Sequence, residues 1–282
     1  MTDQSTDSTK ILHWQCAGCA VEYPPGPQPT GLCPICADER QYIPGGVQRW
    51  VSTEELVASG LQVEFTHLEP GLTALTCDGV GIGQSALLIE TANGCLLFDV
   101  PGLITEAAVQ YIRARGPLLG IVASHPHMYG VQQQYSQTFD DAPIYVASKD
   151  AEWVKYSSEA IRLWDEPFEV ATGIWLHQVG GHFMGSTVAV WSAGAEGRGV
   201  LLAGDAIFPV ADGNVTFLRS YPNRIPLSAA VVRRIAAQVE AWEFDRLYNN
   251  FSGTVPSDAH QIIQFSAERY ARWVSGEYDA LT

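Results

Sequence analysis

The segment IVASHPHMYG, residues 121–130, places two histidines directly after a short apolar run. The run predicts a buried strand that ends just before His125. Side chains two positions apart on an extended chain point to the same side, so the imidazoles of His125 and His127 can bind one metal ion. The alternative is that both histidines are structural groups that form hydrogen bonds at the end of the strand.

Two later segments have the same form, an apolar strand that ends in a side chain able to bind a metal. They are LHQVGGHFMGS, residues 176–186, which contains His182, and VLLAGDAIF, residues 200–208, which contains Asp205. Strand ends are where binding groups gather, because the sheet fixes them while the loops stay open. We therefore expect His125, His127, His182 and Asp205 to converge, although Asp205 is also a residue type that forms turns.

Together with LLFDVPG, residues 96–102, these segments resemble in order the motifs of the metallo-β-lactamase superfamily. The resemblance covers about residues 50–282. It implies an α/β fold, an αββα sandwich of two mixed sheets flanked by helices. It also implies that Asp99 orients groups near the metal, that the three histidines bind a first metal, and that Asp205 is the carboxylate that often bridges two metals.

The chain departs from that family at the residues that bind the second metal. Tyr129 stands at the position of the motif's aspartate and Gly130 at that of its next histidine, while LYNNFSGTV, residues 247–255, lacks the family's last histidine. We therefore predict a single metal ion. Gly130 is expected to leave an open wall beside the metal. Tyr129 either donates a hydrogen bond to a developing oxyanion or leaving group, or fills the space left by the aspartate.

Near the start of the chain are two Cys-x-x-Cys pairs separated by 13 residues rich in Pro and Gly. Two such turns supply the four thiolates of a tetrahedral site, and so short a segment needs the metal in order to fold. The segment resembles a zinc ribbon or a rubredoxin-like module, which implies structural zinc or iron; a redox dithiol is the alternative. The module either packs on the main domain or docks a partner or a second copy of the chain. Its ligands are Cys16, Cys19, Cys33 and Cys36.

The overall composition narrows the class of partner. The chain has 282 residues and a formal charge of −15, with 31 acidic and 16 basic residues. A surface of that sign repels phosphate backbones, so nucleic acid and anionic membranes are not expected partners. No apolar run is long enough for a membrane span, and the polar start does not resemble a secretory signal. The expected location is the cytoplasm, and the expected partner is a small-molecule substrate.

The chain divides into a disordered lead-in (1–10), the cysteine module (11–46) and one main domain (47–282). Within the main domain, grouped strands come first and alternating strands and helices follow. Helices are predicted at about 105–115, 149–158, 227–242 and 257–275, with Thr105 as an N-cap.

The leading hypothesis is a hydrolase in which one zinc ion activates water to attack an ester, thioester, lactone or amide carbonyl. Asp205 would be a fourth ligand or would orient the water, and Tyr129 is a second candidate catalytic residue. One alternative is a mononuclear non-haem iron oxygenase, similar to persulfide dioxygenases, with His125, His182 and Asp205 as a facial triad. The other is a non-catalytic binding or scaffold protein with a decayed site.

Overall fold

The computed structural model describes residues 11–282, and the predicted lead-in of residues 1–10 lies outside them. The apolar segments in the first part of the main domain form a seven-stranded mixed sheet whose strands lie in sequence order. The first four strands pair antiparallel and the last three extend the sheet in parallel. The strands are β3 (Glu64–Glu69), β4 (Leu72–Thr76), β5 (Ser85–Thr91), β6 (Gly94–Phe98), β7 (Leu118–Val122), β8 (Ile144–Ala147) and β9 (Ile161–Trp164).

A second, six-stranded sheet follows, in the order β10-β11-β12-β13-β18-β19. It is also mixed, because β13 and β18 pair in parallel while the other neighbours are antiparallel. The strands are β10 (Phe168–Ala171), β11 (Ile174–Gln178), β12 (Thr187–Trp191), β13 (Val200–Leu202), β18 (Arg246–Tyr248) and β19 (Thr254–Val255).

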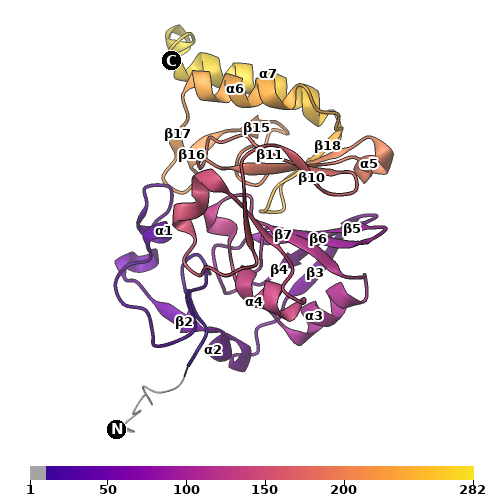
Figure 1. Ribbon diagram of the computed structural model, residues 1–282. Helices are drawn as coiled ribbons and strands as arrows, with labels where there is room; N and C mark the ends of the chain where they lie inside the picture. Colours follow the sequence, from indigo (N-terminus) through magenta and orange to yellow (C-terminus); the bar gives the residue numbers. More distant parts are fainter. Residues whose placement is uncertain (1–10) are drawn as a thin grey trace.

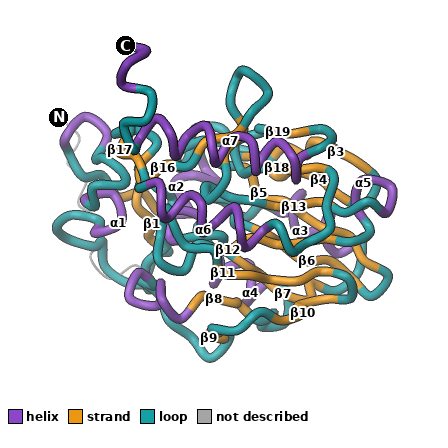
Figure 2. Tube along the Cα trace, turned by 90° about the horizontal axis from the view of Figure 1, so that it is seen from above, coloured by secondary structure: helices purple, strands orange, loops and turns teal. Residues whose placement is uncertain are grey.

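The two sheets pack face to face, and helices cover their outer faces (Figure 1). A buried cluster that includes Leu96 and Phe98 of the first sheet and Leu176 and Leu202 of the second fills the space between them. Helices α6 (Ala229–Val239) and α7 (Ala259–Val274) lie across the second sheet (Figure 2), and α3 (Glu106–Arg113) and α4 (Gln132–Thr138) cover the first. The predicted αββα sandwich is confirmed.

The cysteine module lies at one side of the sandwich, in the indigo part of Figure 1. Its strand β1 (Trp14–Cys16) pairs antiparallel with β2 (Trp50–Ser52), so this small sheet extends past the boundary predicted at residue 46. The short helix α1 (Pro34–Ala37) carries Cys36, and α2 (Thr53–Ala58) begins with Ser52 in a capping box that uses Glu55.

Two local predictions differ from the structure. The helix predicted at 149–158 is a short 3-10 helix, η3 (Ser148–Trp153), in which the carboxyl group of Asp150 accepts a hydrogen bond from the distant backbone N–H of Gly185. Helix α4 was not predicted, since its sequence QQQYSQT offers no apolar stripe and no local side-chain cap. By contrast, Thr105 caps α3 as predicted, accepting from the backbone N–H of Ala108.

The remaining elements are short and lie mostly in loops. They are α5 (Gly194–Gly197), β14 (Phe208–Pro209), β15 (Val215–Thr216), β16 (Leu218–Ser220), β17 (Ile225–Pro226), η1 (Pro44–Gly46), η2 (Pro126–Met128) and η4 (Asp279–Leu281). Among the helices of residues 11–282, none combines the length and apolar character required to cross a bilayer.

Candidate metal centre

The structure brings His125, His127, His182 and Asp205 together at one edge of the two sheets. One side-chain atom from each lies within 4.8 Å of the others, and all four residues are buried. His125 and His127 follow β7 in the turn η2, His182 lies in the loop between β11 and β12, and Asp205 follows β13. Both sheets therefore contribute to the group, as expected for side chains at strand ends.

Hydrogen bonds to backbone and side chains fix which imidazole nitrogens face the centre of the group. Asp99 accepts the backbone N–H of Ser124 at 2.7 Å, and the Ser124 Oγ lies 2.9 Å from Nδ1 of His125. Nε2 of His125 is thereby directed to Asp205 Oδ2, 3.6 Å away. Nδ1 of His182 donates to the carbonyl O of Leu218 at 3.3 Å, which leaves its Nε2 for the centre. Asp99 thus orients His125 through Ser124, the kind of supporting contact common around bound metals.

The donor set fits a cation. Nε2 of His125 and Oδ1 of Asp205 are buried and have no hydrogen-bond partner among the described residues. A buried polar atom left without a partner costs about 1–3 kcal/mol, so two in one small site indicate a ligand that both can bind. Imidazole and carboxylate together are donors typical of zinc and iron.

The protonation states of the four side chains agree with a metal-binding role. Burial lowers the pKa of His125 and of His127 well below its ordinary value, and lowers that of His182 to about 4, so all three imidazoles are neutral at pH 7. Burial, helped by the charge of Asp99, raises the pKa of Asp205 to about 8. A nearby cation would reverse that shift and hold Asp205 as a carboxylate.

The four cysteines of the module form a second buried group, also within 4.8 Å of one another. The Sγ atoms of Cys16 and Cys36 are 3.6 Å apart and those of Cys19 and Cys33 3.8 Å, and no disulfide joins them. Four sulfurs held tetrahedrally about 2.3 Å from one zinc ion lie about 3.8 Å apart, so the spacing suits a metal. Gln48 Nε2 donates to Cys16 Sγ at 3.2 Å, which favours the thiolate.

A cavity of about 620 Å³ lies between the module and the histidine group. The main domain contributes His127, His182 and Asp205 together with aromatic residues. Residues of the module and of the segment that joins it to β2 form the facing wall, and the set includes Cys16, Cys36, Arg40, Gln48 and Arg49. This shared wall leaves no sign in the sequence, because no local pattern indicates that segments far apart in the chain, such as those of Arg40 and His182, enclose one space.

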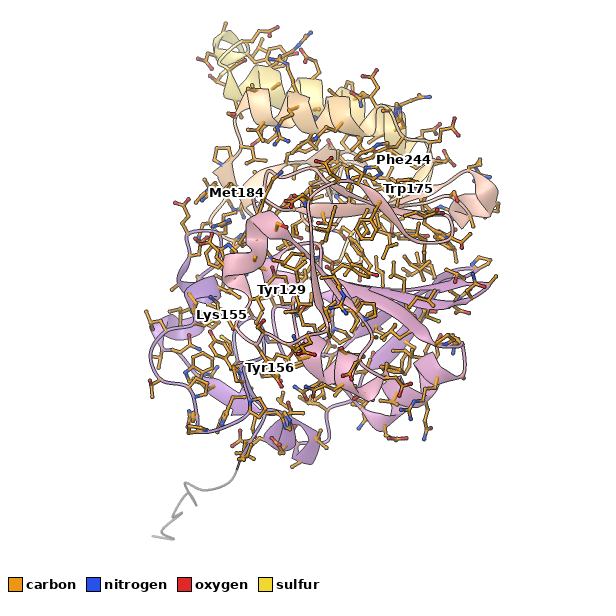
Figure 3. All side chains as sticks on the ribbon, viewed as in Figure 1. Tyr129, Lys155, Tyr156, Trp175, Met184 and Phe244 are labelled. Atoms are coloured by element: carbon orange, nitrogen blue, oxygen red, sulfur yellow. The ribbon has the colours of Figure 1, made fainter. Side chains whose placement is uncertain are left out.

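Of the two residues that replace family ligands, Tyr129 points away from the group. It is buried in the core on the side of the first sheet, where its hydroxyl donates to the backbone carbonyl O of Asp150 at 3.1 Å (Figure 3). It is not among the residues that line the cavity. The structure therefore does not bring Tyr129 together with the four other predicted site residues.

Gly130 does not provide the open wall that we predicted. Its φ is +48°, and a Cβ at this position would lie 2.5 Å from the carbonyl O of Val100 and 2.6 Å from that of Pro101. The prediction was wrong because a missing side chain does not leave space where the backbone of a neighbouring loop already lies. Glycine is required here by the backbone conformation and by this close approach.

The segment that lacks the last family histidine places Asn250 beside the two carboxyl groups. Asn250 is fully buried, and its side chain opposes the effect of burial on the pKa of both Asp99 and Asp205. Burial is the larger effect and raises the pKa of Asp99 to about 7.

Two further aromatic residues, Phe208 and Tyr221, line the cavity, and the Tyr221 hydroxyl donates to the backbone carbonyl O of Asp205 at 2.9 Å. Phe183 is buried against the histidines. Met184 is exposed on the surface and does not line this cavity (Figure 3).

Comparisons with known proteins give one relative in sequence and several in structure. No model of a known protein family matches the chain. YmaE, an uncharacterized protein of Bacillus subtilis strain 168, is 38% identical over 272 residues, which cover 94% of this chain and 98% of YmaE.

Solved structures of metallo-β-lactamases share the fold at low sequence identity. DIM-1 metallo-β-lactamase superposes with a TM-score of 0.56 at 13% identity, over 74% of this chain and 98% of that one. FIM-1 from Pseudomonas aeruginosa in its mono-zinc form gives 0.54 at 14% identity, over 74% and 96%. A B3 metallo-β-lactamase with an active-site glutamic acid gives 0.52 at 15% identity, over 81% and 96%.

Proposed function

Because the chain belongs to the same family as YmaE and has the metallo-β-lactamase fold, we propose that it is a metal-dependent hydrolase with a mononuclear site. The observation that carries this proposal is the convergence of three neutral imidazoles and one carboxyl group beside a cavity of substrate size. His125, His127 and His182 would hold the ion, and Asp205 would be a fourth ligand or act on the water.

A bound zinc ion would polarise the substrate carbonyl and supply an activated water at neutral pH. In the hydrolysis, the water oxygen bonds to the carbonyl carbon, the bond to the leaving oxygen, sulfur or nitrogen breaks, and a proton of the water passes to the leaving group. Asp205 is suited to orient the water and to move that proton, because its Oδ1 has no partner among residues 11–282.

In this proposal the site is mononuclear because the residues that would bind a second metal are missing. Tyr129 and Gly130 stand where the family's motif has two ligands, and neither offers a donor atom to the group. Asn250 adds an uncharged amide next to Asp99 and Asp205. The likeness to FIM-1 in its mono-zinc form supports the idea that this fold accommodates one zinc ion.

The position of His127 favours the hydrolase over the iron oxygenase. A facial triad of His125, His182 and Asp205 would leave His127 as a bystander, yet Nδ1 of His127 lies 3.3 Å from Nε2 of His182 inside the same group. Tyr129 receives no catalytic role in the proposal. In the proposal the module forms part of the cavity wall, because its residues enclose the site. Docking of a partner or of a second copy of the chain through the module stays a prediction.

The proposal is tested with the zinc-loaded full chain and a panel of p-nitrophenyl esters, aryl lactones and thioesters. We expect turnover of at least one class, and a loss of about 100-fold or more in kcat/KM for His182→Ala, with oxygen uptake absent. His260→Ala, a change at a half-buried histidine of α7 that does not line the cavity, is the matched control. Turnover that survives in a His182→Ala variant lacking the metal, or no turnover of any class, would contradict the proposal.

A further inference from the structure

Building on the proposed hydrolysis, we propose that Arg40 of the cysteine module binds a carboxylate group of the substrate. The enzyme would then act on small acyl compounds that carry a carboxylate at one end and the scissile carbonyl at the other. Arg40 was not among the residues that the sequence pointed to. It is 7% exposed, and it lines the cavity together with His127, His182 and Asp205.

Arg40 is held in one orientation. Its Nε and Nη2 donate to the two oxygens of Asp38 at 2.6 and 3.0 Å, a two-point ion pair. Its guanidinium carbon lies 3.8 Å from the centre of the Phe183 ring and 5.1 Å from that of Trp153. A guanidinium fixed in this way loses little further freedom when it binds a ligand.

Asp38 uses only one edge of the guanidinium. The Nη1 atom of Arg40 has no hydrogen-bond partner among the described residues, and it is not fully buried. The edge formed by Nη1 and Nη2 therefore remains for a ligand. Two parallel N–H donors match the two oxygens of one carboxylate.

Two arginines lie in the wall of the cavity. Arg40 and Arg49 line it together with the carboxyl group of Asp205, in a chain whose net charge is −15. Asp38, which pairs with Arg40, and the thiolates of Cys16 and Cys36 offset part of their positive charge, so the free N–H edge of Arg40 is the feature that selects an anion. A divalent ion would add to the positive side.

Apolar residues complete the cavity and limit the size of the ligand. Ile82, Phe208 and Phe251 line it, and the volume of about 620 Å³ accommodates a small organic acid with an apolar body. A carboxylate on Arg40 would direct the rest of such a molecule along these residues and past Asp205.

The test is calorimetric binding of benzoate and of benzamide, its uncharged isostere, to the zinc-loaded full chain. Wild type should bind benzoate about tenfold or more tightly than benzamide. Arg40→Met should lower benzoate affinity about tenfold and change benzamide affinity little, while Arg40→Lys should give an intermediate loss. Arg233→Met, which removes a surface arginine paired with Glu268 at 3.1 Å, is the matched control and should change neither affinity.

Equal affinity of wild type for the two probes overturns the inference, and so does a folded Arg40→Met variant that keeps full benzoate affinity. Because a zinc ion can itself bind a carboxylate, the supporting result is the loss of benzoate selectivity in Arg40→Met, or in Arg40→Lys where Arg40→Met fails to fold. The binding test is independent of the proposed hydrolysis. Benzoate selectivity that depends on Arg40 supports the inference even if the chain hydrolyses none of the test substrates.

Discussion

The carboxyl group of Glu22, in the cysteine module, accepts a hydrogen bond from the backbone N–H of Gln133 in the first turn of α4. The backbone N–H of Glu22 also donates to the carbonyl O of Gly130 at 3.0 Å. Glu22 therefore caps a helix that has no local side-chain cap, and it ties the module to the end of the loop that carries His125 and His127. The module and the metal loop are one connected structure.

Glu22 should make stability depend on pH. It is buried, and burial raises its pKa from 4.5 to about 8, so the folded state favours the protonated form. Stability from this source is full below pH 4.5 and is lost as the pH rises through 8. Glu22→Gln carries no charge to bury, so we expect its stability to lie within about 1 kcal/mol of wild type at pH 5 and its advantage to grow by roughly 4 kcal/mol between pH 5 and pH 9.

Urea unfolding at pH 5, 7 and 9 measures this difference. Glu64→Gln, at an exposed position on β3, is the control and should track wild type throughout. A stability difference between Glu22→Gln and wild type that stays constant over this range would show that Glu22 does not titrate as described.

Tyr129→Phe separates a structural from a catalytic role for that hydroxyl. Loss of the hydrogen bond to the carbonyl O of Asp150 should destabilise the fold by about 1 kcal/mol. Because the hydroxyl lies outside the cavity, kcat and KM of the zinc-loaded protein should stay within about twofold of wild type. A selective fall in kcat of tenfold or more, with native stability, would return Tyr129 to the catalytic machinery.

Gly130→Ala tests the close approach at that position. The new Cβ would meet the carbonyls of Val100 and Pro101, so we expect destabilisation of about 3 kcal/mol or more. Gly197→Ala is the matched control: its φ is +85° with no atom within 4 Å of the added Cβ, so only the conformational cost of about 1 kcal/mol remains. Equal effects in the two variants would mean that the contact with the Val100 loop is not rigid.

The parts that sequence analysis predicted are those encoded locally. His125, His182 and Asp205 each follow an apolar strand, and this pattern of strands with polar ends predicted the convergence. The sandwich was implied by the resemblance of these segments to the metallo-β-lactamase superfamily. The cap from Glu22 and the charge of Arg40 in the cavity depend on contacts between residues about 90 or more positions apart, which leave no periodic signal. Gly130 was misjudged because the identity of a residue does not show which backbone lies against it.

The most direct test of the central claim, one metal ion in the histidine site, is the zinc content of the zinc-loaded full chain, measured by elemental analysis beside the His125→Ala/His182→Ala variant. We predict about two zinc ions per chain in wild type, one in each group, and about one in the variant, held by the four cysteines. A value of about three in wild type would reveal a second metal in the histidine site. About two in the variant would show that the histidines do not hold the ion.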